Sequence, residues 1–381
     1  MDVKILRGEN KIGENLIEIT TKSTRILLEC GKALEETTET KSVENRVLKE
    51  KYDAIFISHS HLDHAGLLTS KACANSIYMG EDTFKLLSYN KSICEENIPK
   101  IVTFKAGEEI NVGDCKITAH LCDHSCFDSF MFEIKTADKT ILYTGDFRSH
   151  GRKSFDKLLC NLPKNIDILI CENTNGQRLS TSTKSEYALQ KEAEKIMAEN
   201  STVYIMQAST NIDRLVSFYK ASTKTQHDFI MQKTMSEIAG MLKNIPNPAK
   251  FKNCYLCVHR KITKEQTAEL KNAYNKKFIS YHTTAKMPKI SMLVSSSSLG
   301  VIKKLTEVRG AENAVLIYSM WGGYKTKSES VKNFLKEIEN LGIKIVNLHT
   351  SGHADSEAIS KIKNAVNPQK VVYVHGENKG E

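Results

Sequence analysis

The stretch ISHSHLDHAGLL, residues 57–68, places three histidines and one aspartate within six positions, directly after the apolar run 54–56. Imidazole nitrogens and carboxylate oxygens are ligands that zinc-class ions prefer. In this H-x-H-x-D-H spacing, His59 and His61 can face one ion while Asp63 and His64 turn toward a second. The same residues could instead cap a strand or occur together by chance, but four ligand-type residues at one strand exit favour a site for two metal ions.

Two further ligand-type residues follow apolar runs later in the chain. His124 in CDHSCFDSF and Asp146 in ILYTGDFR each come after such a run and before a turn. Both side chains can therefore project from the same edge of a sheet. As a carboxylate, Asp146 could bridge both ions.

Composition is that of an ordinary soluble protein: 381 residues, of which 40% are apolar and 26% charged. The N-terminal residues have no apolar signal region, and no run approaches the roughly 18 apolar residues of a membrane span. We therefore expect neither secretion nor membrane insertion, and a cytoplasmic location. The ten cysteines are scattered, often within strand-like runs, which favours reduced, buried thiols. The single C-x-x-C, Cys254 and Cys257, is interpreted as strand packing.

The positive charge is concentrated in one segment. Residues 176–347 hold 27 Lys and Arg against 14 Asp and Glu, a net charge of +13, whereas the remainder holds 27 against 31, a net −4. A basic segment beside a cluster of acids and imidazoles suggests a polyanionic substrate. A lysine-rich, solvated surface would explain the charge equally well.

Hydrophobic patterning divides the chain at similar positions. Residues 1–175 contain many short apolar or alternating runs typical of strands, and few helical patterns. Residues 176–347 alternate helical and strand-like runs, which predicts a parallel, helix-covered sheet. Ser185 is a candidate helix start and Gly342 a candidate stop. The final stretch reads as strand, loop, helix and strand, with histidines at the two strand ends.

At the ligand-type residues the chain resembles the metallo-β-lactamase superfamily. One branch is more similar still: the β-CASP nucleases, which include ribonuclease J and the mRNA 3′-end cleavage factors. That branch adds an acid, an inserted α/β domain, a histidine in an S-G-H-A loop and a final histidine in V-H-G-E. The matching residues here are His59, His61, Asp63, His64, His124, Asp146, Glu172 in ICENTN, His353 in TSGHADS and His375 in YVHGE.

The resemblance implies an α/β fold in which both chain ends build one domain. Residues 1–175 and 348–381 would form an αββα metallo-β-lactamase sandwich, and 176–347 would form the inserted α/β β-CASP domain. The substrate groove would then lie between the two domains.

The resemblance also implies roles for the site residues. One zinc ion would take His59, His61 and His124, the other would take Asp63, His64 and His375, and Asp146 would bridge them with a water. His353 would protonate the leaving 3′ oxygen with Glu172 favouring its protonated form, and the products would carry a 5′-phosphate and a 3′-hydroxyl. His353 could instead be a loop histidine that bonds the backbone of Ser351 or Gly352. The catalytic candidates are His353, Glu172 and Asp63, and the cofactor is two Zn²⁺, with Mn²⁺ as an alternative.

One residue departs from the family pattern. The family has Asp in its first motif, where LLECG offers Glu29. This residue is expected to orient a metal ligand without binding the metal, so a longer carboxylate would change the fine geometry of the centre without removing a ligand.

The segment MQASTNIDR follows a strand and opens a helix, so its amides could cradle a phosphate. It resembles the family's phosphate pocket, with candidates Ser209, Thr210, Asn211 and Arg214, although Ser-Thr-Asn is also an ordinary helix cap. Four other positions are left open. Arg148 and His150 could steer substrate or lie on the surface, and Trp321 with Tyr324 could stack on a base or anchor a domain boundary.

The resulting prediction is a zinc-dependent hydrolase, a ribonuclease acting on single-stranded RNA. The RNA-processing branch has histidine at the last motif, where DNA-processing relatives have valine, and this chain has His375. A DNA nuclease of the same fold and a non-catalytic RNA-binding subunit are the alternatives. The sequence leaves open exonucleolytic or endonucleolytic cleavage, RNA preference, the physiological metal and the oligomeric state.

Overall fold

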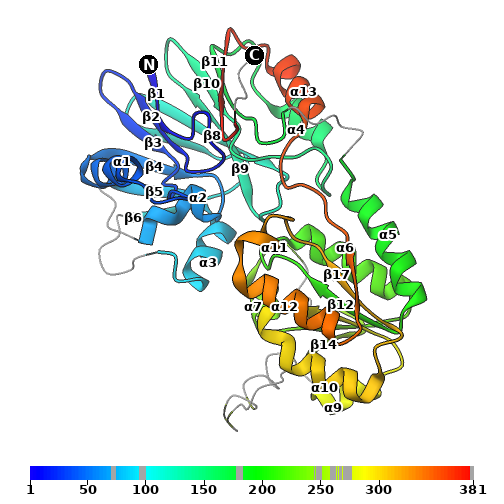
Figure 1. Ribbon diagram of the computed structural model, residues 1–381. Helices are drawn as coiled ribbons and strands as arrows, with labels where there is room; N and C mark the ends of the chain where they lie inside the picture. Colours follow the sequence, from blue (N-terminus) through cyan, green and yellow to red (C-terminus); the bar gives the residue numbers. More distant parts are fainter. Residues whose placement is uncertain are drawn as a thin grey trace. The chain divides into compact units, whose positions relative to one another are not determined.

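The computed structural model describes residues 1–69, 74–93, 100–176, 183–243, 245, 251–257, 263, 265, 268 and 277–377. The chain divides into two compact units, which are described separately: unit 1 is Met1–Thr183 with Ser351–Glu381, and unit 2 is Lys184–Thr350 (Figure 1). The insert expected at 176–347 falls close to unit 2. No helix in the described ranges has both the length and the apolar character needed to cross a membrane.

Unit 1 is built on two six-stranded sheets. Sequence patterning identified nine of these twelve strands, but the strands at residues 2–7, 100–104 and 109–112 were not among those expected. The first sheet runs in the order β1 (Asp2–Arg7), β2 (Leu16–Thr20), β3 (Arg25–Leu28), β4 (Tyr52–Ile57), β5 (Ala74–Gly80) and β6 (Lys100–Phe104). The second runs in the order β19 (Lys370–Val374), β11 (Ile168–Glu172), β10 (Thr140–Tyr143), β9 (Ser129–Lys135), β8 (Cys115–Cys122) and β7 (Glu109–Val112).

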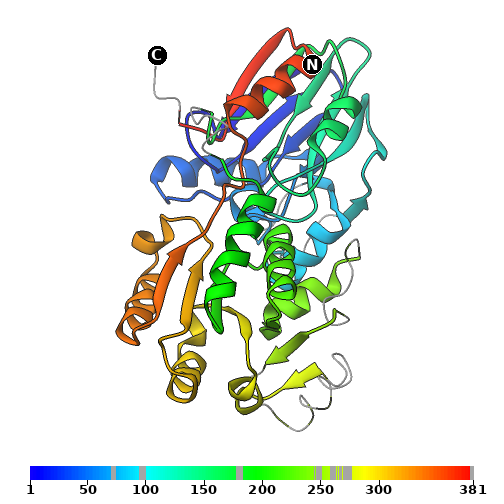
Figure 2. The same ribbon diagram turned by 90° about the vertical axis from the view of Figure 1, so that its right-hand side faces the viewer.

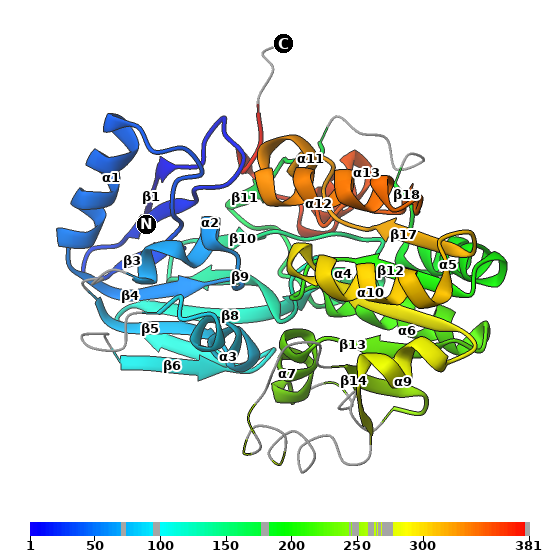
Figure 3. The ribbon, with the colours of Figure 1, turned by 60° about the horizontal axis from the view of Figure 1, so that its bottom comes forward.

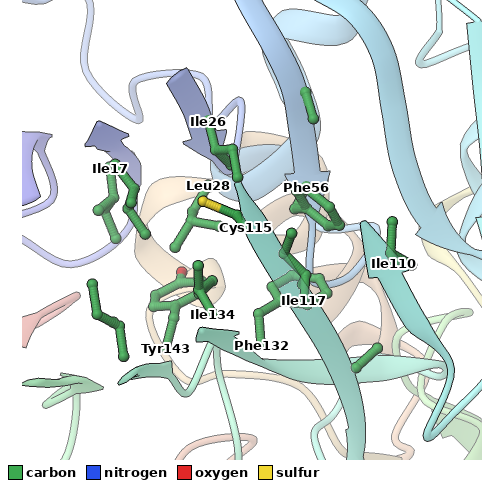
Figure 4. Close-up of a cluster of buried hydrophobic side chains, with 14 of the residues drawn as sticks. Ile17, Ile26, Leu28, Phe56, Ile110, Cys115, Ile117, Phe132, Ile134 and Tyr143 are labelled. Carbon is green, nitrogen blue, oxygen red and sulfur yellow. The ribbon is translucent and has the colours of Figure 1, made fainter. Parts of the chain in front are cut away.

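The main core of unit 1 lies between the two sheets (Figure 4). Inward-facing apolar residues of both sheets interdigitate there, because alternate side chains of a strand point to the same face. The rings of Phe56 in β4 and Phe132 in β9 meet edge to face at 5.5 Å. This apolar layer holds the two sheets in a fixed relation, so their edges can carry a precise site.

Helices cover the outer face of each sheet and complete four layers, α, β, β, α, as predicted (Figure 1). Val47 of α1 and Leu87 of α3 pack on the first sheet. Leu158 of α4 and Ile362 of α13 pack on the second. The helices of unit 1 are α1 (Thr38–Lys49), α2 (Leu62–Ala65), the 3-10 turn η1 (Gly66–Thr69), α3 (Glu81–Tyr89), α4 (Phe155–Asn161) and α13 (Ser356–Val366).

The second sheet joins both ends of the chain. β19, from the last segment, pairs in parallel with β11, which pairs in parallel with β10. β9 is antiparallel to both β10 and β8, so β8 runs in the same direction as β10. The carboxyl ends of β8, β10, β11 and β19 therefore meet at one edge of this sheet, which positions the site described below.

Unit 2 is a seven-stranded sheet in which every pairing is parallel. Helices cover both faces, as the alternating pattern predicted: α5 and α6 lie on one side, and α10 and α12 on the other (Figure 2). Ser185 caps α5, since its hydroxyl accepts from the amide of Ala188. The sheet order is β15 (Phe278–Ile279), β14 (Cys254–Cys257), β13 (Asp228–Met231), β16 (Ile290–Val294), β12 (Thr202–Met206), β17 (Ala314–Tyr318) and β18 (Lys344–Asn347). The helices among the described residues of unit 2 are α5 (Glu186–Glu199), α6 (Ile212–Lys224), α7 (Lys233–Met241), α9 (Tyr281–Lys286), the 3-10 turn η6 (Ser296–Ser298), α10 (Leu299–Arg309), α11 (Tyr324–Lys327) and α12 (Glu329–Asn340).

Candidate metal centre

Seven ligand-type side chains of unit 1 converge where strands end. Parallel strands bring their carboxyl ends to the same sheet edge, so residues distant in the sequence become neighbours. The seven are His59 and His61 after β4, Asp63 and His64 in α2, His124 after β8, Asp146 after β10 and His375 after β19.

Three of the histidines and Asp146 form a first group. Nε2 of His59 lies 3.0 Å from Nδ1 of His61, and Nε2 of His124 lies 3.3 Å from the same His61 atom. Oδ2 of Asp146 is 3.9 Å from Nε2 of His59 and 3.7 Å from Nε2 of His124. These four ligand atoms lie within 4.8 Å of one another, which is close enough to hold one ion.

The protonation of the first group suits a cation. Nδ1 of His124 donates to the Gly352 carbonyl at 2.7 Å, so its unprotonated Nε2 faces the cluster. Burial lowers the pKa of His124 and of His59 well below the usual value, and lowers the pKa of His61 to about 4. The rings are therefore neutral near pH 7, and their nitrogen lone pairs lie close together. A neutral imidazole with its other nitrogen bonded outside the site is the form that binds metal.

A second group consists of Asp63, His64 and His375. Nε2 of His375 lies 3.2 Å from Oδ2 of Asp63, and Nε2 of His64 lies 3.9 Å from the same oxygen. Oδ2 of Asp146 is 3.3 Å from Nε2 of His64 and 3.6 Å from Nε2 of His375. Asp146 thus stands between the two groups, within 4 Å of nitrogens from both.

The hydrogen bonding of Asp146 tests whether these residues fit a metal. Its side chain is buried, and neither carboxylate oxygen has a hydrogen-bond partner among the described residues. A buried carboxylate without hydrogen bonds is costly unless a cation compensates its charge. The donor set, all histidine nitrogens and carboxylate oxygens, matches zinc-class ligands. The residues present therefore fit a metal centre.

Glu29, which replaces the expected Asp, lies directly behind His64. Its Oε1 is 3.3 Å from Nδ1 of His64, and its Oε2 accepts from the amide of Ser58 at 3.1 Å. Burial would lower the pKa of His64, but the carboxylates of Asp146 and Glu29 raise it well above the usual value. The longer side chain thus reaches the ring nitrogen that faces away from the cluster and leaves Nε2 directed at Asp146.

Thr174 supports His375 in a similar way and was missed in the sequence. Its hydroxyl donates to the His375 carbonyl at 2.8 Å and lies 2.7 Å from Nδ1 of the same residue. A hydroxyl that donates to the carbonyl can accept from Nδ1–H, which leaves Nε2 unprotonated toward Asp63. The signal was available, since Thr174 lies two positions after Glu172 at a strand's carboxyl end.

His353 and Glu172 form a pair beside these groups. Nδ1 of His353 lies 3.1 Å from Oε2 of Glu172, and Oε1 of Glu172 accepts from the amides of Phe147 and Ala354 at 2.9 and 3.3 Å. Burial alone would lower the pKa of His353, but Glu172 and Asp146 together raise it to about 9. Together with Asp146 and His375, these two residues also lie close enough to hold a metal ion. The direct contact between His353 and Glu172 favours a role in proton transfer instead.

The backbone around His353 is held by several polar side chains of unit 1. The Ser351 carbonyl accepts from Nε2 of His150 at 2.8 Å and from the buried Arg148 guanidinium at 3.4 Å. Arg148 is in turn paired with Asp123 at 2.6 Å. Arg148 and His150 therefore face this loop, which corrects the alternative of a simple surface role for both.

Gly352 lets this loop approach the first group. A Cβ at this position would lie 2.2 Å from Oγ of Ser125 and 3.2 Å from the His124 ring. Asn175, also missed in the sequence, donates from its side-chain amide to the Ser351 hydroxyl at 2.6 Å. Together these contacts fix the position of His353 relative to Asp146, at 3.6 Å between Nδ1 and Oδ2.

The phosphate-pocket candidates lie in unit 2. Asn211 caps α6, and its side chain accepts from the amide of Arg214 at 3.0 Å, as in the ordinary helix cap that the sequence left open. Ser209 and Thr210 are partly exposed in the turn before it.

The structure does not support Arg214 as a phosphate ligand. Its side chain is fully buried and paired with the buried Glu186 at 3.0 Å, and it also donates to the Ser319 hydroxyl at 2.6 Å. Its charge is therefore satisfied inside unit 2. The prediction failed because the partner, Glu186, lies on the preceding helix, outside the motif.

Two family models match the chain. Residues 24–190 match the beta-lactamase superfamily domain, and residues 340–380 match the Zn-dependent metallo-hydrolase RNA specificity domain. The first range contains six of the seven ligand-type residues, and the second contains His353 and His375.

Curated relatives match between about half and nearly all of the chain. Ribonuclease J of Mycoplasma genitalium is 23% identical over 408 aligned residues, covering 98% of this chain and 67% of the relative. The RNase J-like protein of Methanocaldococcus jannaschii is also 23% identical, covering 98% of this chain and 92% of the relative. Cleavage and polyadenylation specificity factor 73 of Drosophila melanogaster is 27% identical over 47% of this chain and 29% of its own length.

A solved structure shares the fold. The crystal structure of a protein of unknown function from Enterococcus faecalis V583 superposes with a TM-score of 0.74 at 19% identity, covering 98% of this chain and 94% of the other. The chain thus carries a metallo-β-lactamase domain and an RNA specificity domain, and its relatives are consistent with the β-CASP nuclease family.

Proposed function

We propose that this protein is a metal-dependent ribonuclease that hydrolyses phosphodiester bonds of single-stranded RNA. The observation that carries the proposal is the convergence of seven ligand-type side chains beside the His353–Glu172 pair. The match to an RNA specificity domain and the relatives named Ribonuclease J support RNA as the substrate.

The proposed centre holds two zinc ions, with manganese as an alternative. The first group, His59, His61 and His124, would hold one ion, and the second group, Asp63, His64 and His375, would hold the other, with Asp146 shared between them. When bound, such ions polarise a phosphate group and make water more acidic. The Gly352 carbonyl and the Thr174 hydroxyl would keep His124 and His375 in the tautomers that this requires, with Nε2 unprotonated.

The His353–Glu172 pair is assigned the protonation of the leaving group. With its pKa raised to about 9, His353 is protonated near pH 7, and Nδ1 is directed at Glu172, so the transferable proton is on Nε2. Water adds to the phosphorus and gives up one proton to the solvent, the bond from phosphorus to the 3′ oxygen breaks, and the Nε2 proton of His353 passes to that oxygen. A proton from the solvent then restores the charged form of His353. The products are a 5′-phosphate and a 3′-hydroxyl.

Unit 2, assigned here to the β-CASP insert, would supply attraction for the RNA backbone. Residues 184–350 hold 26 Lys and Arg against 14 Asp and Glu, a net charge of +12. Basic surfaces bind phosphate backbones largely by releasing counterions, so affinity should fall steeply with salt.

The test is digestion of a 5′-monophosphorylated RNA by protein whose metal content has been measured. We expect cleavage with zinc or manganese, loss of cleavage with a chelator, and products with 5′-phosphate ends. Intact RNA at micromolar, fully metal-loaded protein would contradict the proposal. DNA of the same sequence is the matched control: preferential DNA cleavage would indicate a DNA nuclease, and RNA binding without cleavage would indicate a non-catalytic subunit.

A further inference from the structure

Unit 2 exposes a pair of large aromatic rings at the carboxyl end of β17. Trp321 is the only tryptophan in the chain, and it is 50% exposed, while Tyr324 is 46% exposed. The two rings meet edge to face, with centroids 5.4 Å apart and planes at 87°. Single exposed apolar residues are common, but two adjacent aromatic rings form a patch that is more often functional.

The loop that carries these rings is ordered by hydrogen bonds and close packing. The Trp321 carbonyl accepts from the hydroxyl of Tyr318 at 3.1 Å and from the amide of Tyr324 at 3.2 Å. A Cβ at Gly323 would lie 2.2 Å from the indole ring, so the glycine allows the indole to lie across the loop backbone. The ring is thus fixed at the surface while Tyr318, in the same segment, is buried in the core.

Lysines adjoin these aromatic rings. Nζ of Lys327 lies 5.4 Å from the centroid of the indole, and Nζ of Lys325 lies 4.6 Å from the ring of Tyr318. Residues 319–328 contain these two lysines and no acidic residue. An aromatic platform with cations beside it fits a ligand that has flat rings and a negative backbone, whereas an apolar protein partner would not need the charge.

The position of the aromatic pair relative to the sheet also favours a ligand-binding site. In parallel α/β sheets, ligands bind beyond the carboxyl ends of strands, near the strand where the order reverses. That strand is β12, because the chain proceeds from it to β13 on one side and later to β17 on the other. The amide of Ser319 donates to the carbonyl of Met206 at 2.8 Å and joins the ends of β17 and β12. Figure 3 shows α11, which begins at Tyr324, beside α12.

We propose that Trp321 and Tyr324 form a base-stacking site for single-stranded RNA, with Lys325 and Lys327 beside the backbone phosphates. The site rests on the proposed function for the identity of its ligand, and it adds a contact to bases that the metal centre does not provide. Stacking on an aromatic ring tolerates any base, so the site contributes affinity without sequence preference.

The single tryptophan makes the site directly observable. The probe is an oligoadenylate added to the full chain carrying His353→Ala, which keeps the RNA intact, and tryptophan emission is recorded beside the anisotropy of labelled RNA. We expect the oligoadenylate to quench the emission and an abasic ribose-phosphate oligomer of equal length to leave it unchanged. Trp321→Ala should weaken binding by about 5- to 100-fold, and Trp321→Phe should retain most of the affinity.

Tyr187 provides a matched control. It is 62% exposed on α5 and also has a lysine, Lys191, over its ring, so Tyr187→Ala should leave RNA affinity unchanged. The inference is overturned if RNA binds without altering the emission, if the abasic oligomer binds equally well, if Trp321→Ala binds like the parent chain, or if no RNA binds. Quenching by RNA in a chain whose wild-type form does not cleave RNA would refute the nuclease function alone, and cleavage without quenching would refute only this site.

Discussion

Oε2 of Glu172 lies 3.1 Å from Nδ1 of His353, although 181 positions separate the two residues in the sequence. Glu172 ends β11, and His353 precedes α13, so the contact exists only because the last segment of the chain returns to unit 1 beside β11. The carboxylate orients the ring and raises its pKa. The pair therefore combines a proton donor with the group that keeps it charged.

Replacing His353 separates proton transfer from metal binding. His353→Ala removes the proposed donor to the leaving oxygen and none of the seven ligands, so we expect turnover to fall by about 10²- to 10⁴-fold while bound metal is unchanged. RNA cleavage rates and metal content by mass spectrometry measure both effects. His120→Ala is the control. His120 pairs with Glu133 at 3.0 Å and belongs to none of the ligand groups, so its loss should change neither turnover nor bound metal. Normal turnover in His353→Ala would refute the assigned role.

The pH dependence of turnover tests the influence of Glu172. Because Glu172 and Asp146 raise the pKa of His353 to about 9, the active protonated form is present below that pH and is lost as the pH rises through it. Glu172→Gln removes one of these charges and should move the alkaline limb of kcat to lower pH by at least about one unit. An alkaline limb at the same pH in both proteins would show that Glu172 does not control this proton.

Replacing His150 tests whether this residue supports the loop that carries His353 or steers the substrate. His150→Ala removes the 2.8 Å hydrogen bond to the Ser351 carbonyl, so we expect kcat to fall by up to about 10²-fold, with KM and bound metal nearly unchanged. His150→Gln, which keeps an N–H donor, should restore much of kcat. A rise in KM at constant kcat would instead place His150 in substrate binding.

Arg214 is predicted to matter for stability and not for RNA binding. Arg214→Met leaves Glu186 buried without its partner, and should lower the free energy of unfolding by about 3–5 kcal/mol. Urea denaturation measures this, and the double variant Glu186→Leu with Arg214→Met should recover much of the loss. Unchanged stability together with weaker RNA binding would restore Arg214 as a phosphate ligand.

Much of this architecture follows from local signals. The strand ends before His59, His124, Asp146 and Glu172 are marked by apolar runs, and the parallel sheet of unit 2 by its alternating pattern. These features depend on hydrophobic periodicity, which the sequence displays directly. Ligand-type residues at strand ends are visible for the same reason.

The residues that sequence reasoning missed depend on contacts between distant segments. Thr174 meets His375 across 201 positions, and Arg148 meets Ser351 across 203. Arg214 was misassigned because its buried partner is 28 residues earlier on α5. No local pattern encodes such a pairing, since it depends on how helices and strands pack. The strand at 2–7, although its first residues alternate between exposed and partly buried, was overlooked because no turn signal precedes it.

The metal content of the purified protein, measured by mass spectrometry after saturation with zinc and removal of free ions, tests the central claim most directly. We predict about two equivalents in the wild-type chain and a clear loss in Asp146→Ala, because the Asp146 carboxylate lies within 4 Å of nitrogens in both groups. A wild-type chain that retains no metal, or an Asp146→Ala variant that retains the full wild-type content, would contradict the proposed centre.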